Sequence, residues 1–124
     1  MRLLLDTHVL LWWLAAEPIH PNARDAIANA RSTVFVSAAS AWELSIKRSL
    51  GKLEAPTDVE AQLRRHRFQP LAITVRDGLL AGSLPDLHAD PFDRMLVAQA
   101  LNEELTVVTR DDRIAEYGVR TLAA

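Results

Sequence analysis

Four acidic side chains stand at points where a chain of alternating strands and helices would bring them together. Asp6 and Asp111 come shortly after apolar runs, Glu43 falls in the first turn of a predicted helix, and Asp93 heads another helix. Carboxylates that converge in one cleft repel each other and raise their own pKa values, and a hard divalent cation resolves this conflict. Oxygen-only ligands favour Mg²⁺ or Mn²⁺ over Zn²⁺. Because Mg²⁺ also binds phosphates, the pattern predicts metal-assisted hydrolysis of a phosphodiester.

Taken one at a time, three of these acids have ordinary structural explanations. Asp6 is suited to cap the helix that follows it, a role that is compatible with metal binding. Glu43 and Lys47 have the four-residue spacing of an exposed helical ion pair, which contributes only ~0.3–0.5 kcal/mol. Either Asp111 or Asp112 could cap the last helix. We interpret Asp111 as the site residue and keep Asp112 as the alternative.

Asp93 is harder to explain without chemistry. Leu96 and Val97 follow it by three and four residues, so Asp93 begins the apolar stripe of its helix. A carboxylate aligned with a buried face is costly unless it is paired or bound to metal. Asp90 fits the capping role better, because Pro91 suits the first helical position. We therefore assign Asp90 to capping and Asp93 to the site.

Other polar residues add less to this pattern. Thr109 ends a predicted strand and could hydrogen-bond a neighbouring acid. His8 lies two residues from Asp6, either near the site or simply on the surface. The histidines show no pair spacing that is typical of zinc sites; they are His8, His20, His66 and His88.

The elements that must position these residues can be predicted from apolar runs and helix stop signals. Short apolar runs predict strands at residues 3–5, 33–36, 70–73, 105–108 and 119–122. Helices are expected at residues 8–16, 22–30, 40–50, 58–67, 74–81, 91–103 and 112–117. Asn22 is the expected cap of the second helix, and Thr57 or Asp58 of the fourth. Such alternation predicts an open, parallel α/β sheet that binds ligands beyond the carboxyl ends of its strands.

Composition narrows the class of protein. The 124 residues fit one domain, and a net charge of −2 is unlike a general nucleic-acid binder, so any such surface must be a local basic patch. The absence of cysteine excludes disulfides and thiolate metal sites. The apolar start is too short for a signal peptide, and no stretch reaches the ~20 apolar residues of a membrane span. We expect a cytoplasmic protein.

The order and spacing of four motifs resemble those of PIN-domain ribonucleases, in particular the VapC toxins of prokaryotic type II toxin–antitoxin systems. The motifs are Leu4-Leu5-Asp6-Thr7-His8, Ser40-Ala41-Trp42-Glu43-Leu44 with Lys47, Asp90-Pro91-Phe92-Asp93-Arg94 through Ala100, and Val108-Thr109-Arg110-Asp111. The resemblance implies a single PIN domain over residues 1–124, a three-layer α/β sandwich with strand order 3-2-1-4-5. It also implies Mg²⁺-dependent cleavage of RNA, often tRNA or ribosomal RNA, homodimers, and a VapB-type antitoxin.

For the reaction, we expect Asp6 and Asp93 to hold the main metal, with Mn²⁺ as a substitute for Mg²⁺. Glu43 and Asp111 would support it directly or through water, and a metal-activated water would attack the phosphorus. Three cations are candidates for phosphate contact, although each could simply balance nearby carboxylates: Lys47, Arg94 and Arg110.

The tryptophans offer a further prediction about surfaces. Adjacent Trp12 and Trp13 point to different faces of the first helix, so one of them should be exposed. An exposed Trp there would suit a dimer or antitoxin surface, whereas stacking on RNA bases is a second use for these rings.

Two other classes of protein share part of the pattern. A phosphorelay receiver also has acids at strand ends, but it needs paired acids after its first strand, where Asp6 stands alone. A hydrolase that forms a phospho-aspartate usually carries a second acid two residues on, and here that position is His8. A catalytically silent PIN scaffold would be expected to have lost acids. DNA remains an alternative substrate, because the chemistry does not require RNA.

Overall fold

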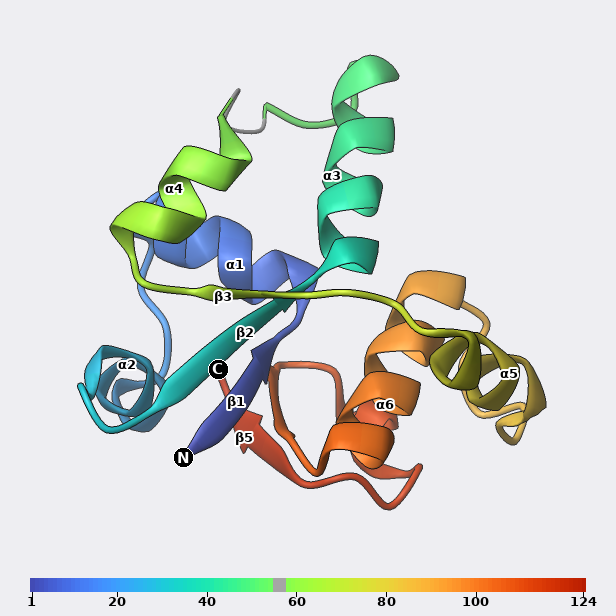
Figure 1. Cartoon of the computed structure of the whole chain (residues 1–124). Coiled ribbons are helices and arrows are strands. Elements are labelled where there is room, and N and C mark those ends of the chain that lie inside the picture. The colour runs from blue at the N-terminus through green and yellow to red at the C-terminus, as the bar shows by residue number, and fades with distance from the viewer. Residues whose placement is uncertain (55–57) are drawn as a thin grey trace.

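The central sheet is made of short apolar strands that pair in parallel. In the computed structural model, which describes residues 1–54 and 58–124, the order of the strands is β3-β2-β1-β4-β5 (Figure 1). The order implied by the resemblance is therefore confirmed. The strands are β1 (Arg2–Leu5), β2 (Thr33–Ser37), β3 (Gln69–Leu71), β4 (Thr106–Thr109) and β5 (Thr121–Ala123).

Helices connect the strands and cover both faces of the sheet, as the alternation of strands and helices predicts. Their bounds are α1 (Thr7–Leu14), α2 (Pro21–Ala28), α3 (Ala38–Ser49), α4 (Val59–Arg65), α5 (Val75–Ser83), α6 (Pro91–Glu103) and α7 (Asp112–Ala115). None of the helices in residues 1–54 and 58–124 combines the length and apolar character that crossing a bilayer requires.

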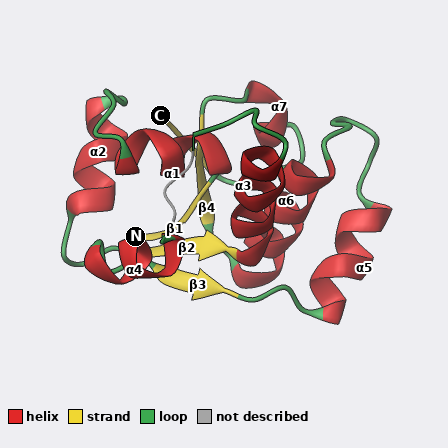
Figure 2. Cartoon of the chain, turned by 90° about the horizontal axis from the view of Figure 1, so that it is seen from above, coloured by secondary structure: helices red, strands yellow, loops and turns green. Residues whose placement is uncertain are grey.

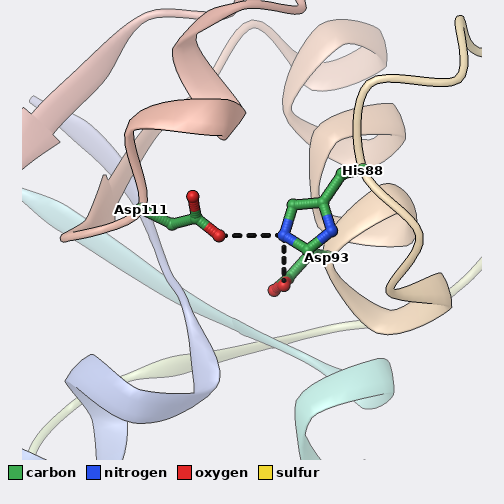
Figure 3. A group of neighbouring side chains, drawn as sticks. All are labelled: His88, Asp93 and Asp111. Atoms are coloured by element: carbon green, nitrogen blue, oxygen red, sulfur yellow. Dashed lines mark hydrogen bonds and ion pairs between the residues drawn. The ribbon is translucent and has the colours of Figure 1, made fainter.

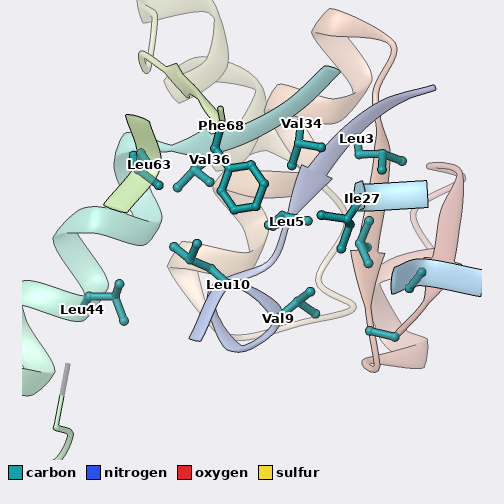
Figure 4. Packing of buried hydrophobic residues seen from close by; sticks show 13 residues of the cluster. Leu3, Leu5, Val9, Leu10, Ile27, Val34, Val36, Leu44, Leu63 and Phe68 are labelled. Carbon is teal, nitrogen blue, oxygen red and sulfur yellow. The ribbon is translucent and has the colours of Figure 1, made fainter. Parts of the chain in front are cut away.

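The alternation of side chains along β1 divides the core in two. Leu3 and Leu5 point to the face that α1, α2 and α4 cover, and their cluster is drawn in Figure 4. Leu4 points to the opposite face, where it packs with residues of α6 and α7 such as Leu96 and Ile114. All three leucines of β1 are fully buried. Because both faces are covered, the carboxyl edge of the sheet is the place left for a site.

The start of α3 differs from the prediction in a way that moves a site residue. Ser37 caps this helix by accepting a hydrogen bond from the backbone N–H of Ala39, at 3.0 Å. The helix therefore begins at Ala38, two residues earlier than expected, and Glu43 lies in its second turn rather than its first. The expectation for the turn was wrong because a serine inside the strand's own sequence acts as the cap.

The cap of α2 was also predicted wrongly. Nδ1 of His20 accepts the N–H of Asn22 at 3.1 Å, so His20 and not Asn22 is the cap. Pro21 takes the first helical position, so the cap is the residue directly before it, His20. At α4 the cap is Asp58, whose Oδ1 accepts the N–H of Ala61, while Thr57 lies outside the described residues.

Three strands are displaced from their predicted bounds, and β4, at Thr106–Thr109 instead of residues 105–108, differs by one residue at each end. β3 begins at Gln69 and ends at Leu71 instead of covering residues 70–73, and β5 begins at Thr121 instead of residue 119. Val119 is buried in the second core cluster, so its apolar character serves packing before the strand begins. Short apolar runs indicate burial more reliably than they indicate strand bounds.

A capping box joins the start of α5 to α6. Thr74 Oγ1 accepts the N–H of Asp77, and Asp77 Oδ2 accepts the N–H of Thr74. Asn102 of α6 donates to the other oxygen of Asp77 at 2.8 Å. Burial raises the pKa of Asp77, but the hydrogen bonds from Asn102 and Thr74 outweigh it, so the pKa is lowered overall. The ionised carboxylate is thus the form that stabilises the packing of α5 on α6.

We expect Asp77→Ala to reduce the free energy of unfolding at pH 7 by ~1–3 kcal/mol, because it removes the acceptor of the Thr74 N–H in the capping box and the partner of Asn102. Since the pKa of Asp77 is lowered on folding, its contribution is complete above the ordinary carboxyl pKa of about 4 and is lost as the pH falls through the folded value. Urea denaturation of both proteins at pH 7 and at lower pH measures this. Asp86→Ala, at an exposed loop residue, is the control, and equal losses in the two variants would contradict the prediction.

Candidate metal centre

Asp6 lies directly after β1 and is held at the carboxyl edge of the sheet from two sides. Its Oδ1 accepts the N–H of Val9 at 2.9 Å, which caps α1. Its Oδ2 accepts the hydroxyl of Thr109, at the end of β4, at 2.7 Å. The side chain is 6% exposed. Capping and a place at the site are therefore combined in one residue, as the sequence allowed.

Thr109 links two of the acids. Its hydroxyl donates to Asp6 and at the same time accepts the backbone N–H of Asp111 at 3.0 Å. The prediction that Thr109 hydrogen-bonds a neighbouring acid is confirmed. Because β1 and β4 are paired neighbours in the sheet, this one hydroxyl fixes the spacing between Asp6 and the start of the segment that carries Asp111.

Glu43 comes from α3, which packs against α6 near the carboxyl ends of the strands (Figure 2). It is 4% exposed, and Lys47, one turn later, donates to its Oε2 at 2.8 Å. The hydrogen bond with Glu43 is the largest cause that raises the pKa of Lys47, and the charges of Asp90 and Asp93 add to it. The ion pair is therefore not a purely solvated one, and it lies within electrostatic reach of the acids of α6.

Asp93 stands in the first turn of α6, while Asp90 caps that helix by accepting the N–H groups of Phe92 and Asp93. The predicted division of roles between Asp90 and Asp93 agrees with this capping. Burial first, and then the charges of Asp90, Asp6 and Glu43, raise the pKa of Asp93 to about 7 against an opposing effect from His88. The carboxylate of Asp93, which begins the apolar stripe, is thus buried close to the negative charges of the other acids.

Asp111, and not its neighbour Asp112, joins this group. Asp111 caps α7, whereas Asp112 is exposed at the first helical position. Arg113 donates to Asp111 from its backbone N–H and from its guanidinium, and the side-chain hydrogen bond is the main reason that the pKa of Asp111 falls to about 2. Asp111 therefore reaches the site as a carboxylate.

His88 completes the group between two acids (Figure 3). Its Nε2 lies 2.8 Å from Oδ2 of Asp111 and 3.1 Å from Oδ2 of Asp93. The three side chains each offer one ligand atom, and these atoms lie within 4.8 Å of one another. Nearby, Asp6 and Glu43 are close enough to raise the pKa of Asp93. A set dominated by carboxylate oxygens, with a concentration of negative charge, fits a hard divalent cation.

Comparison with known proteins shows the family of the chain. The family model for the PIN domain matches residues 3–119. Ribonuclease VapC22 of Mycobacterium tuberculosis is 30% identical over 119 residues, which span 92% of this chain and 90% of the relative. The chain belongs to the PIN-domain family of VapC ribonucleases.

Solved structures share the fold of this PIN domain. VapBC2 from Rickettsia felis, bound to a DNA fragment from its promoter, matches with a TM-score of 0.74 and 16% identity, covering 99% of this chain and 98% of that one. DNA-bound VapBC from Salmonella typhimurium matches with a TM-score of 0.71 and 22% identity, over 99% and 98% of the two chains. At these identities the likeness concerns the fold.

His88 is the residue of this PIN-domain site that sequence reasoning missed. We looked for histidine pairs at zinc spacing and considered His8, which is exposed and lies against the ring of Trp12. The available signal was position, because His88 comes two residues before the cap of α6. The backbone N–H of Asp90 donates to its Nδ1, so the turn that starts the helix also orients the imidazole.

Of the three cations considered for phosphate contact, Arg94 has its donors occupied by the chain. Its guanidinium donates to the backbone carbonyls of Ala81, Leu84 and Pro85 at 2.9–3.0 Å. Arg110 donates to the carbonyl of Pro18 and lies 3.9 Å over the ring of Trp12. Lys47, by contrast, pairs with Glu43 and keeps 37% of its side chain exposed.

The exposed tryptophan is not on the first helix, so that prediction was wrong. Trp12 and Trp13 are both half-buried and pack against the core, because α1 is covered on more than one side. Trp42 of α3 is 61% exposed, and its ring stands edge-on to that of Phe92 at 5.3 Å. An aromatic pair therefore lies one residue from Glu43 and one residue from Asp93.

We expect Asp93→Asn to stabilise the metal-free protein. The pKa of Asp93 is about 7 in the folded chain and ~4 in the unfolded chain, so ionisation disfavours folding as the pH rises between these values and the penalty is complete above them. The neutral amide removes it, which should raise the free energy of unfolding at pH 8 by on the order of 1–3 kcal/mol.

Urea denaturation in EDTA at pH 8 and pH 5.5 measures this effect, which should shrink at the lower pH. Asp112→Asn, at the exposed acid beside Asp111, is the matched control. A variant that is less stable than the parent at pH 8 would show that the carboxylate of Asp93 is stabilised rather than repelled by its neighbours.

Proposed function

We propose that this PIN domain is a divalent-metal-dependent endoribonuclease that acts as the toxin of a type II toxin–antitoxin pair. One observation supports the proposal: carboxylates from separate elements gather at one edge of the sheet, where Thr109 joins Asp6 to the start of the Asp111 segment and His88 Nε2 lies between Asp93 and Asp111. The family and the ribonuclease relative support the nuclease class.

Asp6 and Asp93 would hold a Mg²⁺ or Mn²⁺ ion, with Glu43 and Asp111 as direct or water-linked supports. Such an ion supplies positive charge that offsets these carboxylates and polarises the phosphate and the attacking water. The residues around it do the positioning. Thr109 and the start of α1 orient Asp6, and Asp90 fixes the first turn of α6 so that Asp93 faces the group.

Attack by water needs no 2′-hydroxyl, so the expected products carry a 5′-phosphate and a 3′-hydroxyl. Lys47 is our candidate for phosphate contact, because its side chain is partly exposed and pairs with a site acid. Arg110 is a second candidate, although its guanidinium would have to leave the Trp12 ring or reach past it. We propose RNA, with tRNA or ribosomal RNA as the first substrates to test.

The toxin role rests on the relatives. The neighbours from Rickettsia felis and Salmonella typhimurium are VapBC complexes. We propose that this chain likewise binds a VapB-type antitoxin, forms a homodimer and works in the cytoplasm as a single domain over its length. The receiver-like alternative is not retained, because the chain belongs to another family. A silent scaffold is the outcome that the cleavage experiment would reveal.

Purified protein should cut a few species of total cellular RNA with Mg²⁺ or Mn²⁺ and none with EDTA. Asp93→Asn and Asp6→Asn should reduce cleavage to background while the circular dichroism spectrum is unchanged, since each amide keeps the shape of the carboxylate it replaces. Asp86→Asn, at an exposed acid before α6, should cut like the parent. Folded, antitoxin-free protein that cuts no RNA with either metal would leave the scaffold as the better account.

Induction of the gene in a bacterial host should arrest growth, and Asp93→Asn should not, because arrest requires the nuclease. Co-expression of a small antitoxin gene from the same locus should restore growth, and the antitoxin protein should co-purify with this chain. Growth arrest by the Asn variant at equal expression would separate toxicity from cleavage and contradict the proposed role.

A further inference from the structure

Both ring nitrogens of His88 have polar neighbours: a backbone N–H on one side and two carboxylates on the other. The side chain lies in the segment between α5 and α6 and is 6% exposed. Nδ1 is 3.1 Å from the backbone nitrogen of Asp90, and Nε2 faces Oδ2 of both Asp93 and Asp111 (Figure 3). The ring therefore spans the distance between the start of α6 and the segment after β4.

The partner of Nδ1 decides where the ring carries its proton. A backbone N–H can only donate, so Nδ1 must present its lone pair to Asp90, and the proton of the ring must be on Nε2. Asp90 cannot easily turn away, since its own side chain caps α6 by accepting the N–H of Phe92 at 2.8 Å. The hydrogen that faces the two carboxylates is thus set by the start of the helix.

A protonated Nε2 cannot bind a metal, because ligation uses the lone pair of that nitrogen. To become a ligand, His88 would have to move its proton to Nδ1, where it would meet the N–H of Asp90. That change would leave a backbone donor without its partner and place two N–H groups against each other. The position of Nε2 between the two carboxylates is therefore better explained by a hydrogen bond to Asp111, with Asp93 close beside it, than by metal ligation.

We infer that His88 is a positioning residue whose Nε2–H donates to Asp111 and faces Asp93 at 3.1 Å, and that it holds these two carboxylates together for a shared cation without binding it. The inference rests on the proposed function, in which the acids bind a metal. The two carboxylates come from different elements and repel each other, and the imidazole is the donor that contacts both. Groups outside the ligand set that orient the ligands typically change metal affinity by ~10–100-fold when removed.

Nitrogen-15 NMR of the histidine rings tests the position of the proton directly in the unmodified protein. The signal that disappears in His88→Ala identifies the ring. We expect the Nε2-protonated form both without metal and with saturating Mg²⁺. A shift to the Nδ1-protonated form when Mg²⁺ is added would overturn the inference, since it would make His88 a ligand.

Mn²⁺ binding, followed by the electron paramagnetic resonance of the free ion, tests the consequence without any RNA. His88→Ala should weaken Mn²⁺ binding ~10–100-fold, and His88→Gln should recover most of it because the amide keeps an N–H donor of similar reach. His8→Ala, at an exposed histidine, should bind like the parent. Equal affinity in His88→Ala and the parent, or a Gln variant as weak as the Ala variant, would overturn the positioning role.

The failure of this inference and the failure of the proposed function give different results. Protein that binds Mn²⁺ with the expected order of variants but cuts no RNA would support the role of His88 and reject the nuclease. Protein that cuts RNA while His88→Ala binds Mn²⁺ normally would do the reverse. A parent protein that binds neither ion would overturn both.

Discussion

Repulsion between carboxylates at the carboxyl edge of the sheet is the constraint to which the rest of the site responds. Three of the acids have donors that reduce it: Asp6 has Val9 and Thr109, Glu43 has Lys47, and Asp111 has Arg113. The Asp93 carboxylate instead lies 3.1 Å from Nε2 of His88, and the hydrogen bond of that nitrogen goes to Asp111. Burial and then the charges of Asp90, Asp6 and Glu43 raise the pKa of Asp93 to about 7. A cation placed there would offset both the burial of this carboxylate and its repulsion from the neighbouring acids.

The fold can hold this charge because the stability of the domain comes from elsewhere. Leu3, Leu4 and Leu5 bury β1 on both faces, and separate clusters of apolar side chains fill the space under the helices on each side. The acids follow these elements and do not interrupt them. Asp6 comes directly after β1, and Asp93 stands in the first turn of α6, where the positive end of the helix dipole favours a negative charge. Burial of the strands therefore brings the carboxylates together, and the same hydrogen bonds that cap helices keep them oriented.

The parts of the candidate site that the sequence could predict are those that depend on residues close by in the chain. Asp6 after an apolar run, Asp90 before a proline, and Asp93 at the head of an apolar stripe each depend on neighbours within a few residues. His88 had only its position two residues before the cap of α6 as a local signal, and its contact with Asp111, which lies 23 residues away, depends on how the segment between α5 and α6 folds back. Glu43 remains a predicted site residue, but it was placed one turn too early, since Ser37 could be assigned to the strand as well as to the cap. The burial of Trp12 and Trp13 depended on the packing of α1, which no local pattern describes.

The segment between α5 and α6 belongs to the structure of the site, because Arg94 holds it against the start of α6. Arg94 follows Asp93 in the sequence, and its guanidinium donates to the carbonyls of Ala81, Leu84 and Pro85. These bonds fix the segment to the same turn of α6 that presents Asp93. The segment in turn carries His88, whose ring is oriented by Asp90 at the start of that helix. Asp93 and the donor that contacts it are therefore held by the same short stretch of chain, residues 90–94. This explains why an arginine beside a site acid points toward the protein rather than toward a phosphate, and it makes the geometry of Asp93 and His88 a single property of the fold.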